Sequence, residues 1–153
     1  MKENNVFIAH CPTSNLNLAS GIAPIRKYLN NNLKIGLGSD IAGGNTESMF
    51  NAIVDSIQVS KIYWQYIDKT LKHLTFEEAF YMATKGGGEF FGKVGSFEKG
   101  YEFDAIILDD SIVPTPSDLT IRQRLERAVY LSLDTNGITE KYVNGEKIFK
   151  KEI

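Results

Sequence analysis

Two short apolar runs separated by a helical stretch set the pattern of the first forty residues. One run is Val6–Ala9, and the other lies within Lys34–Gly38. Between them, the serine- and asparagine-rich stretch Thr13–Ser20 predicts a loop. Apolar residues at helical spacing predict a helix over Gly21–Asn30, with Pro24 in its first turn. A strand–helix–strand order with apolar strands predicts a parallel pair with a right-handed crossover, and therefore an α/β fold.

Two further helices are predicted before residue 90. Apolar residues that repeat every four positions predict a long helix over Glu47–Tyr66, with Thr46 or Asn45 as its N-cap. The sequence Thr75-Phe76-Glu77-Glu78 is a capping box and predicts the start of the next helix. The glycine-rich stretch Gly86–Gly92 follows that helix rather than a strand and lacks the lysine and hydroxyl of a phosphate loop, so we expect a helix terminus and a turn there.

The second part of the chain has a different character. Phe103–Leu108 is a β-type run, and Leu119–Tyr130 has a helical pattern. Asn144-Gly145, which lies between two short segments with strand composition, is a strong hairpin signal. This part is therefore predicted to form a small β unit with one helix.

Composition and charge narrow the possible partners. The chain has 153 residues, enough for one domain with a buried core. The balance of 17 basic and 19 acidic residues gives a formal net charge of -2, which offers no general attraction to nucleic acid or to an anionic membrane. No apolar run approaches the ~20 residues that span a bilayer. Cys11 is the single cysteine, so no intrachain disulfide can form, and we expect a cytoplasmic protein.

One aspartate stands where enzymes often carry out chemistry. Asp40 lies in the sequence KIGLGSDIAGG, directly after the second predicted strand, and His10 ends the first. Ligands of parallel α/β sheets bind beyond the carboxyl ends of the strands, so both side chains are candidates for a site. The alternative for Asp40 is an ordinary turn or helix-capping residue.

The residues visible here do not make a complete metal site or a nucleophilic triad. A zinc or iron site needs three or four ligands, and the chain has only two histidines. A thiolate pair between Cys11 and His10 is also disfavoured, because adjacent residues of a strand point to opposite faces.

Several short motifs together resemble the carboxyl-terminal third of an amidohydrolase-superfamily enzyme, and within that superfamily the guanine deaminases. Each motif alone is weak, but their combination and order are specific. The motifs are HCPTSNL at 10–16, GIAP at 21–24, GLGSDIAGG at 36–44, ATKGG at 83–87, GSFEKG at 95–100 and FDAI at 103–106.

The resemblance implies a fold and a reaction. It implies the last two β/α units of a (β/α)8 TIM-like barrel over residues 1–92, and a barrel-end helix with carboxyl-terminal strands of a small β-sandwich over residues 93–153. The implied reaction is the hydrolysis of guanine to xanthine and ammonia, with one divalent metal, zinc or iron, that activates water. The purine is thus the implied small-molecule substrate.

The resemblance also assigns roles to four residues. Asp40 matches the aspartate that closes the last barrel strand, which binds the metal, contacts the substrate and helps to move the proton of the attacking water. His10 is expected near the substrate, and Ser14 and Asn15 are expected to support the rim of the site. The family's metal histidines and acid–base glutamate belong to earlier strands and are not in this chain.

We therefore expect the chain to be a fragment, a truncated gene product or one piece of a longer enzyme, inactive and unable to bind zinc tightly on its own. A missing upstream barrel segment or a second copy of the chain would cover its exposed strand edges. Two other functions remain open: a deaminase or chlorohydrolase acting on another purine, a pterin or a triazine, and a non-catalytic interaction module.

Overall fold

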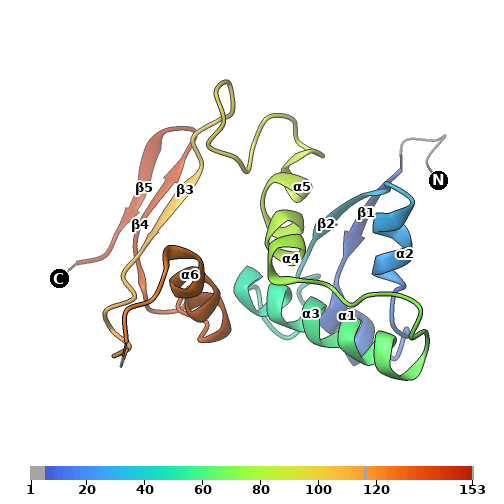
Figure 1. Ribbon diagram of the computed structural model, residues 1–153. Helices are drawn as coiled ribbons and strands as arrows, with labels where there is room; N and C mark the ends of the chain where they lie inside the picture. Colours follow the sequence, from blue (N-terminus) through green and yellow to red (C-terminus); the bar gives the residue numbers. More distant parts are fainter. Residues whose placement is uncertain (1–5, 116, 153) are drawn as a thin grey trace.

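The parallel strand pair predicted from the sequence is present. The computed structural model describes residues 6–115 and 117–152, drawn in Figure 1. Strand β1 spans Phe7–His10 and strand β2 spans Lys34–Leu37, and they pair in parallel with Ile8 opposite Ile35. Strand β1 begins and ends one residue later than predicted, and strand β2 ends one residue earlier than predicted. Helix α2 lies between the two strands in the chain, as the crossover requires.

Two predictions for the segment between these strands are wrong. The stretch predicted as a loop contains helix α1, Pro12–Asn17, which has its proline at the first helical position. Proline is favoured there because its fixed φ suits a helix and its missing N–H has no partner in the first turn. Helix α2 is shorter than predicted and spans Ile25–Asn30. It cannot begin at Gly21, whose φ of +90° lies outside the helical region.

Two longer helices follow β2. Helix α3 spans Met49–Tyr66, and its N-cap is Ser48, which accepts from the amide of Asn51 at 3.1 Å. The predicted caps two and three residues earlier are therefore wrong. Helix α4 spans Phe76–Ala83 and begins with the predicted capping box, and the four-residue helix α5, Lys85–Gly88, stands where a terminus and turn were expected.

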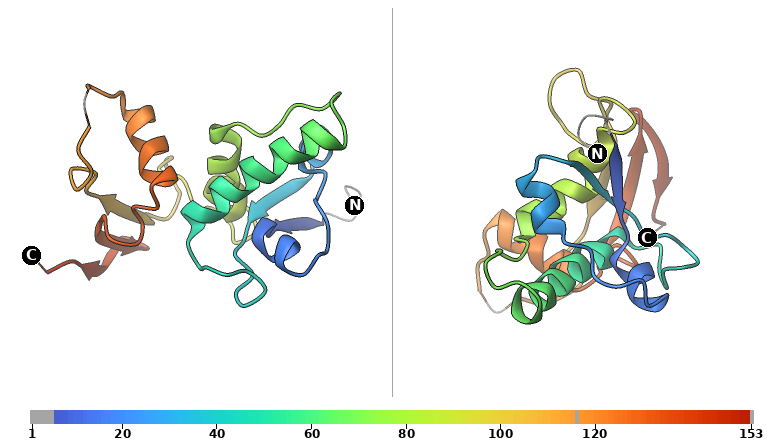
Figure 2. Two further views of the ribbon diagram at one scale, coloured as in Figure 1. Left: turned by 90° about the horizontal axis from the view of Figure 1, so that it is seen from below. Right: turned by 90° about the vertical axis from the view of Figure 1, so that its right-hand side faces the viewer.

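Helices α3 and α4 pack on one side of the strand pair. The core is a cluster of buried apolar side chains from β2, four helical segments and the loop before α4: Ile25, Ile35, Phe50, Ile53, Ile57, Leu74, Phe76, Ala79, Met82 and Val129. In Figure 2, α3 runs along the strand pair. Burial of this apolar surface is the main stabilising contribution to the fold.

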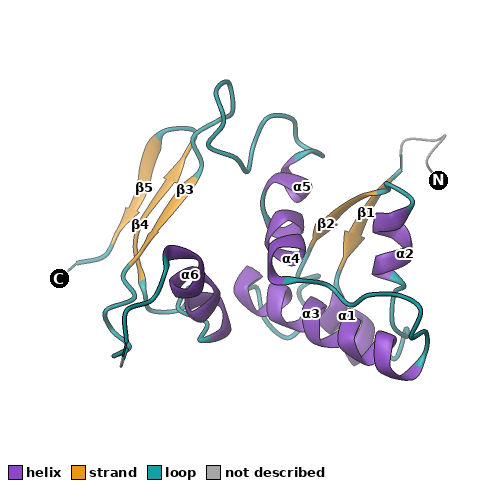
Figure 3. Ribbon diagram, viewed as in Figure 1, coloured by secondary structure: helices purple, strands orange, loops and turns teal. Residues whose placement is uncertain are grey.

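The rest of the chain forms the predicted β unit (Figure 3). Its three strands form an antiparallel sheet in the order β3–β4–β5: Ala105–Leu108, Ile138–Val143 and Glu146–Lys150. The Asn144-Gly145 turn joins the last two strands with φ values of +49° and +79°. Two positive φ values are those of the hairpin turn that the Asn-Gly pair favours.

Helix α6 joins this sheet to the first part of the fold. It spans Ile121–Tyr130, begins with a capping box between Thr120 and Gln123, and lies between the sheet and helices α3 and α4 (Figure 1). Its Val129 is fully buried within the same core cluster as Ile53. The division at residue 92 stays a prediction. Within the part of the chain that is described, no helix is long and apolar enough to cross a bilayer.

Candidate active site

The loop after β2 holds Asp40 in a tight turn. Asp40 has a φ of +49°, and its carbonyl accepts a hydrogen bond from the amide of Gly44 at 2.6 Å. Aspartate is one of the few residues other than glycine that adopts this left-handed conformation readily. Its side chain is exposed. Asp40 therefore lies in a turn and does not cap α3, whose N-cap is Ser48. A position in a turn is compatible with a role in binding, which stays a prediction.

Two glycines allow the loop to close on itself. A Cβ on Gly44 would lie 2.0 Å from the carbonyl oxygen of Ser39. A Cβ on Gly43 would lie 2.6 Å from Ser14 Oγ and 2.8 Å from Asp40 Oδ2. Any side chain at either position would displace the neighbouring backbone or the carboxylate, so the loop requires glycine at both.

Helix α1 holds this loop through two side chains. Ser14 Oγ donates to Asp40 Oδ2 at 2.5 Å, and Asn17 Nδ2 donates to the carbonyl oxygen of Gly43 at 3.0 Å. A third hydroxyl, Thr13 Oγ1, donates to Asp55 Oδ2 on α3 at 2.6 Å rather than to the loop. The structure therefore brings the Ser14 hydroxyl and the Asp40 carboxylate into direct contact.

Asn15 contributes through its backbone. Its amide donates to the carbonyl of Cys11 at 3.1 Å, and its carbonyl accepts from Ser20 at 2.8 Å. Among the residues described, no hydrogen bond involves the Asn15 side chain, which is half-buried.

Cys11 lies beside Asp40, which the sequence reasoning did not anticipate. Its Sγ is 3.0 Å from the position that a Cβ of Gly38 would occupy. Burial raises the pKa of the Cys11 thiol, and the negative charge of Asp40 raises it further, so the thiol is neutral at pH 7. The signal was available: odd-numbered residues of β1 share one side of the strand, and Cys11 continues that alternation.

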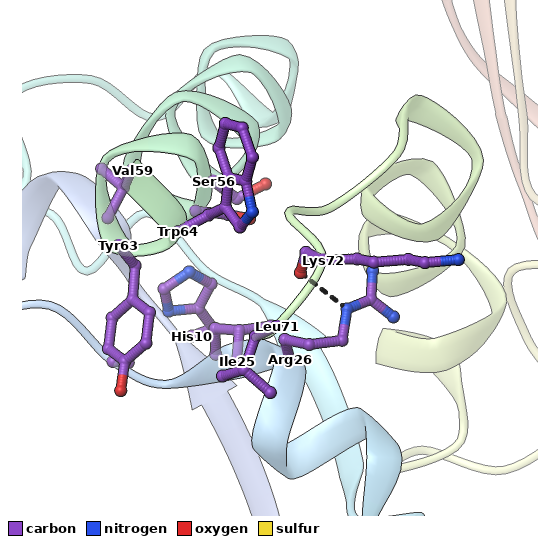
Figure 4. A pocket seen from close by; sticks show the side chains of 11 residues that line it. His10, Ile25, Arg26, Ser56, Val59, Tyr63, Trp64, Leu71 and Lys72 are labelled. Carbon is purple, nitrogen blue, oxygen red and sulfur yellow. Dashed lines mark hydrogen bonds between the residues drawn. The ribbon is translucent and has the colours of Figure 1, made fainter. Parts of the chain in front are cut away.

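His10 points to the opposite side of the strand pair from Cys11. It is 3% exposed, and Figure 4 shows its imidazole among Tyr63 and Trp64 of α3 and Ile25 of α2. Its Nδ1 has no hydrogen-bond partner among the described residues and lies at a cavity of about 10 Å³, the size of one water molecule. Burial lowers the pKa of His10 to about 4, so the ring is neutral at pH 7. The structure does not bring His10 together with Asp40 and Ser14.

A complete metal site is absent from the part of the chain that is described. No group of three or more His, Cys, Asp or Glu side chains there could hold a metal ion. Asp40 nevertheless suits one position in such a site. Asp40 is exposed, and among the described residues its carboxylate accepts a hydrogen bond on Oδ2 only, which leaves Oδ1 available to a cation.

A loop-borne carboxylate at the carboxyl ends of parallel strands is typical of α/β enzymes, whose ligands bind beyond that edge of the sheet. Comparison with known proteins shows the family to which this chain belongs. The sequence profile of the amidohydrolase family matches residues 1–148, and the chain belongs to that family.

Three similar proteins are guanine deaminases. The one from Dictyostelium discoideum is 40% identical over 148 residues, which cover 92% of this chain and 32% of that protein. The crystal structure of the C. acetobutylicum enzyme, with guanine bound in its active site, is 55% identical, with a TM-score of 0.90 over 97% of this chain and 35% of that one. The E. coli enzyme is 28% identical with a TM-score of 0.82, over 98% and 35% of the two chains. The chain thus spans about a third of the length of these relatives.

Proposed function

We propose that this chain is the carboxyl-terminal third of a metal-dependent guanine deaminase, with β1 and β2 as the last two strands of a (β/α)8 barrel. The observation that carries the proposal is the TM-score of 0.90 at 55% identity with an enzyme that holds guanine in its active site. The position of Asp40 at the carboxyl end of β2 supports it independently, because that edge of a barrel carries the active site.

In this proposal, Asp40 acts on the attacking water. A water molecule adds to C2 of guanine, the bond from C2 to the exocyclic amino group breaks, and xanthine and ammonia are the products. Asp40 Oδ1 takes a proton from the water and passes it towards the departing amino group, as a positioned carboxylate can do in general acid–base catalysis. The hydrogen bond from Ser14 holds the other oxygen while this happens.

One divalent cation, zinc or iron, completes the proposed site. Such a cation lowers the pKa of a bound water towards ~7. Asp40 is the one ligand proposed among the described residues, and the remaining ligands are expected on earlier strands of the barrel. We therefore expect the 153-residue chain alone to bind zinc weakly and to leave guanine unchanged.

The side of the strand pair that carries Asp40 suits a flat substrate. Ala9 and Gly38 give it little side-chain bulk, and Ala9 is exposed. Small residues leave room for a planar purine against the strands. Guanine is preferred over a pterin, a triazine or another purine because the similar proteins described above are guanine deaminases.

A chimeric enzyme tests the proposal. The part of the C. acetobutylicum enzyme that precedes the matched region is fused to this chain, and the purified chimera is loaded with zinc. We expect it to convert guanine to xanthine, followed by ultraviolet absorbance and ammonia release. A panel of other purines, pterins and triazines measures specificity. A folded, zinc-loaded chimera that leaves guanine unchanged contradicts the proposal.

Two aspartate variants make the test specific for the site. Asp40→Asn in the chimera is expected to lower kcat by at least about 10²-fold, because general acid–base groups contribute that much or more. Asp118→Asn is the matched control, since Asp118 is an exposed loop carboxylate in the second part of the chain. Equal activity of the two variants would show that Asp40 does not take part in the reaction.

A further inference from the structure

The geometry around α1 points to a residue that fixes the orientation of the Asp40 carboxylate. We propose that Ser14 is a positioning residue, which binds Asp40 Oδ2 and leaves Oδ1 as the only oxygen presented to the cation and the attacking water. The expected effect on metal binding and turnover rests on the proposed function. The hydrogen bond and the close contacts from which the role of Ser14 is inferred lie within this chain.

The first observation is the environment of the hydroxyl. Ser14 is 3% exposed, and its Oγ donates to Asp40 Oδ2 at 2.5 Å across 26 residues of sequence. A buried hydroxyl that donates to an exposed carboxylate is held by its surroundings, so the carboxylate adopts the orientation that the serine sets. Among the described residues, no hydrogen bond involves Oδ1.

The second observation is how tightly the loop fits around this pair. Ser14 Oγ and Asp40 Oδ2 both lie close to Gly43, where a Cβ would come within 2.6 Å of the first atom and 2.8 Å of the second. Asn17 then holds the Gly43 carbonyl at 3.0 Å. Because one helix fixes both the carboxylate and the loop opposite it, the carboxylate cannot turn without moving this loop.

The neighbouring hydroxyl provides a matched control. Thr13 lies on the same helix and also donates to an aspartate at 2.6 Å, but its partner is Asp55 on α3 rather than Asp40. Thr13→Ala and Ser14→Ala therefore remove one hydroxyl–carboxylate hydrogen bond each. A similar decrease in the urea midpoint of unfolding is expected from either variant. Only Ser14→Ala releases Asp40.

The experiment measures metal binding in the chimera described above. Zinc affinity is determined by competition with a chromophoric chelator, and the absorption spectrum of the Co²⁺-loaded protein reports on ligand geometry. We expect Ser14→Ala to weaken zinc binding by about 10–100-fold, the usual effect of removing a group that orients a metal ligand, and to change the Co²⁺ spectrum. Thr13→Ala should leave both unchanged. Turnover of guanine should fall in kcat for Ser14→Ala and not for Thr13→Ala.

Two outcomes separate this inference from the proposed function. If the unsubstituted chimera binds zinc and deaminates guanine but Ser14→Ala and Thr13→Ala behave alike, Ser14 is merely structural and the inference is wrong. If the unsubstituted chimera is folded and binds zinc but does not deaminate guanine, the proposed function is wrong, and the zinc affinities of the two variants still decide the role of Ser14. Urea unfolding of each variant confirms that it is folded.

Discussion

The two sides of the β1–β2 pair differ in what they contain. The helix-facing side carries Ile8, His10, Ile35 and Leu37, and it is covered by α2, α3 and α4. The open side carries Ala9, Cys11, Gly38 and Asp40, which are small or polar and lie towards the carboxyl ends of the strands. The alternation of side chains along a strand thus separates two functions: one side stabilises the fold, and the other is available for chemistry.

This difference has a consequence for substitutions. Changes on the helix-facing side should alter the free energy of unfolding, because they remove buried contacts or place a charge among apolar side chains. Changes at Ala9, Gly38 or Asp40, near the carboxyl ends of the strands on the open side, should leave stability nearly intact and alter the proposed site. Gly36 lies on the same side but is buried against Gly87 of α5, so it belongs with the packed positions.

The largest effect is expected for a truncation on the helix-facing side. Ile35 is 4% exposed within the core cluster. Ile35→Ala should lower the free energy of unfolding by about 2–5 kcal/mol, because it removes buried methyl groups and leaves a cavity. The control is Lys34→Ala, one residue earlier on the same strand and exposed, for which the change should stay within about 0.5 kcal/mol. Urea unfolding followed by circular dichroism measures both, and equal losses would contradict the separation.

His10 should make the stability depend on pH. Burial lowers its pKa to about 4 from 6.5, so the unfolded chain takes up a proton at a higher pH than the folded chain does. Stability from this group is therefore complete above pH 6.5 and is lost as the pH falls towards 4, by up to about 3 kcal/mol. Arg26 and Lys72 line the same cavity, and Arg26 is paired with Glu78 at 2.5 Å.

A variant isolates the contribution of this histidine. His10→Gln keeps a polar side chain of similar size but cannot titrate in this range. Urea unfolding of the two proteins between pH 7 and pH 4 should show a smaller loss of stability in the variant. Parallel curves would mean that His10 does not cause the pH dependence.

Two glycines on the same side of β2 should respond differently to alanine. A Cβ on Gly36 would lie 2.8 Å from the backbone Cα of Gly87, whereas a Cβ on Gly38 would meet only the side-chain sulfur of Cys11, at 3.0 Å. Gly36→Ala should therefore cost about 1–3 kcal/mol, because backbone must shift. Gly38→Ala should cost less, since the thiol can rotate away. A larger cost for Gly38→Ala in urea unfolding would contradict this reading of the strand.

Local patterns predicted the elements whose signals are local. The capping box at Thr75 and the Asn144-Gly145 turn were correct because each depends on residues within one turn of the chain. Helix α1 was missed because serine and asparagine, which make up much of it, also favour loops. The cap of α3 was misplaced because Thr46, a good cap by type, instead accepts from the amide of Ser48 at 3.1 Å.

In the candidate site too, only the features with a local sequence signal could be predicted. The position of Asp40 at the end of a strand could be read from the sequence. Its partner Ser14 could not be identified as such, because the hydrogen bond between them joins residues 26 positions apart and depends on how α1 packs. Nor could the spacing alone show that His10 faces α3, since that depends on which side of the strands the helices cover.

The smallest effect is expected at Cys11, which reports on the charge of Asp40. Burial and then the charge of Asp40 raise the pKa of its thiol, so removing that charge should lower the thiol pKa and increase the thiolate fraction at a given pH. Asp40→Asn in the metal-free chain should therefore speed alkylation of Cys11 by iodoacetamide severalfold at pH 8, because the thiolate is the reacting form. Cys11 is the only cysteine, so the modified site is unambiguous. Asp118→Asn, a change of equal charge in the second part of the chain, should leave the rate unchanged. If both variants react alike, Cys11 and Asp40 do not share the open side of the strand pair.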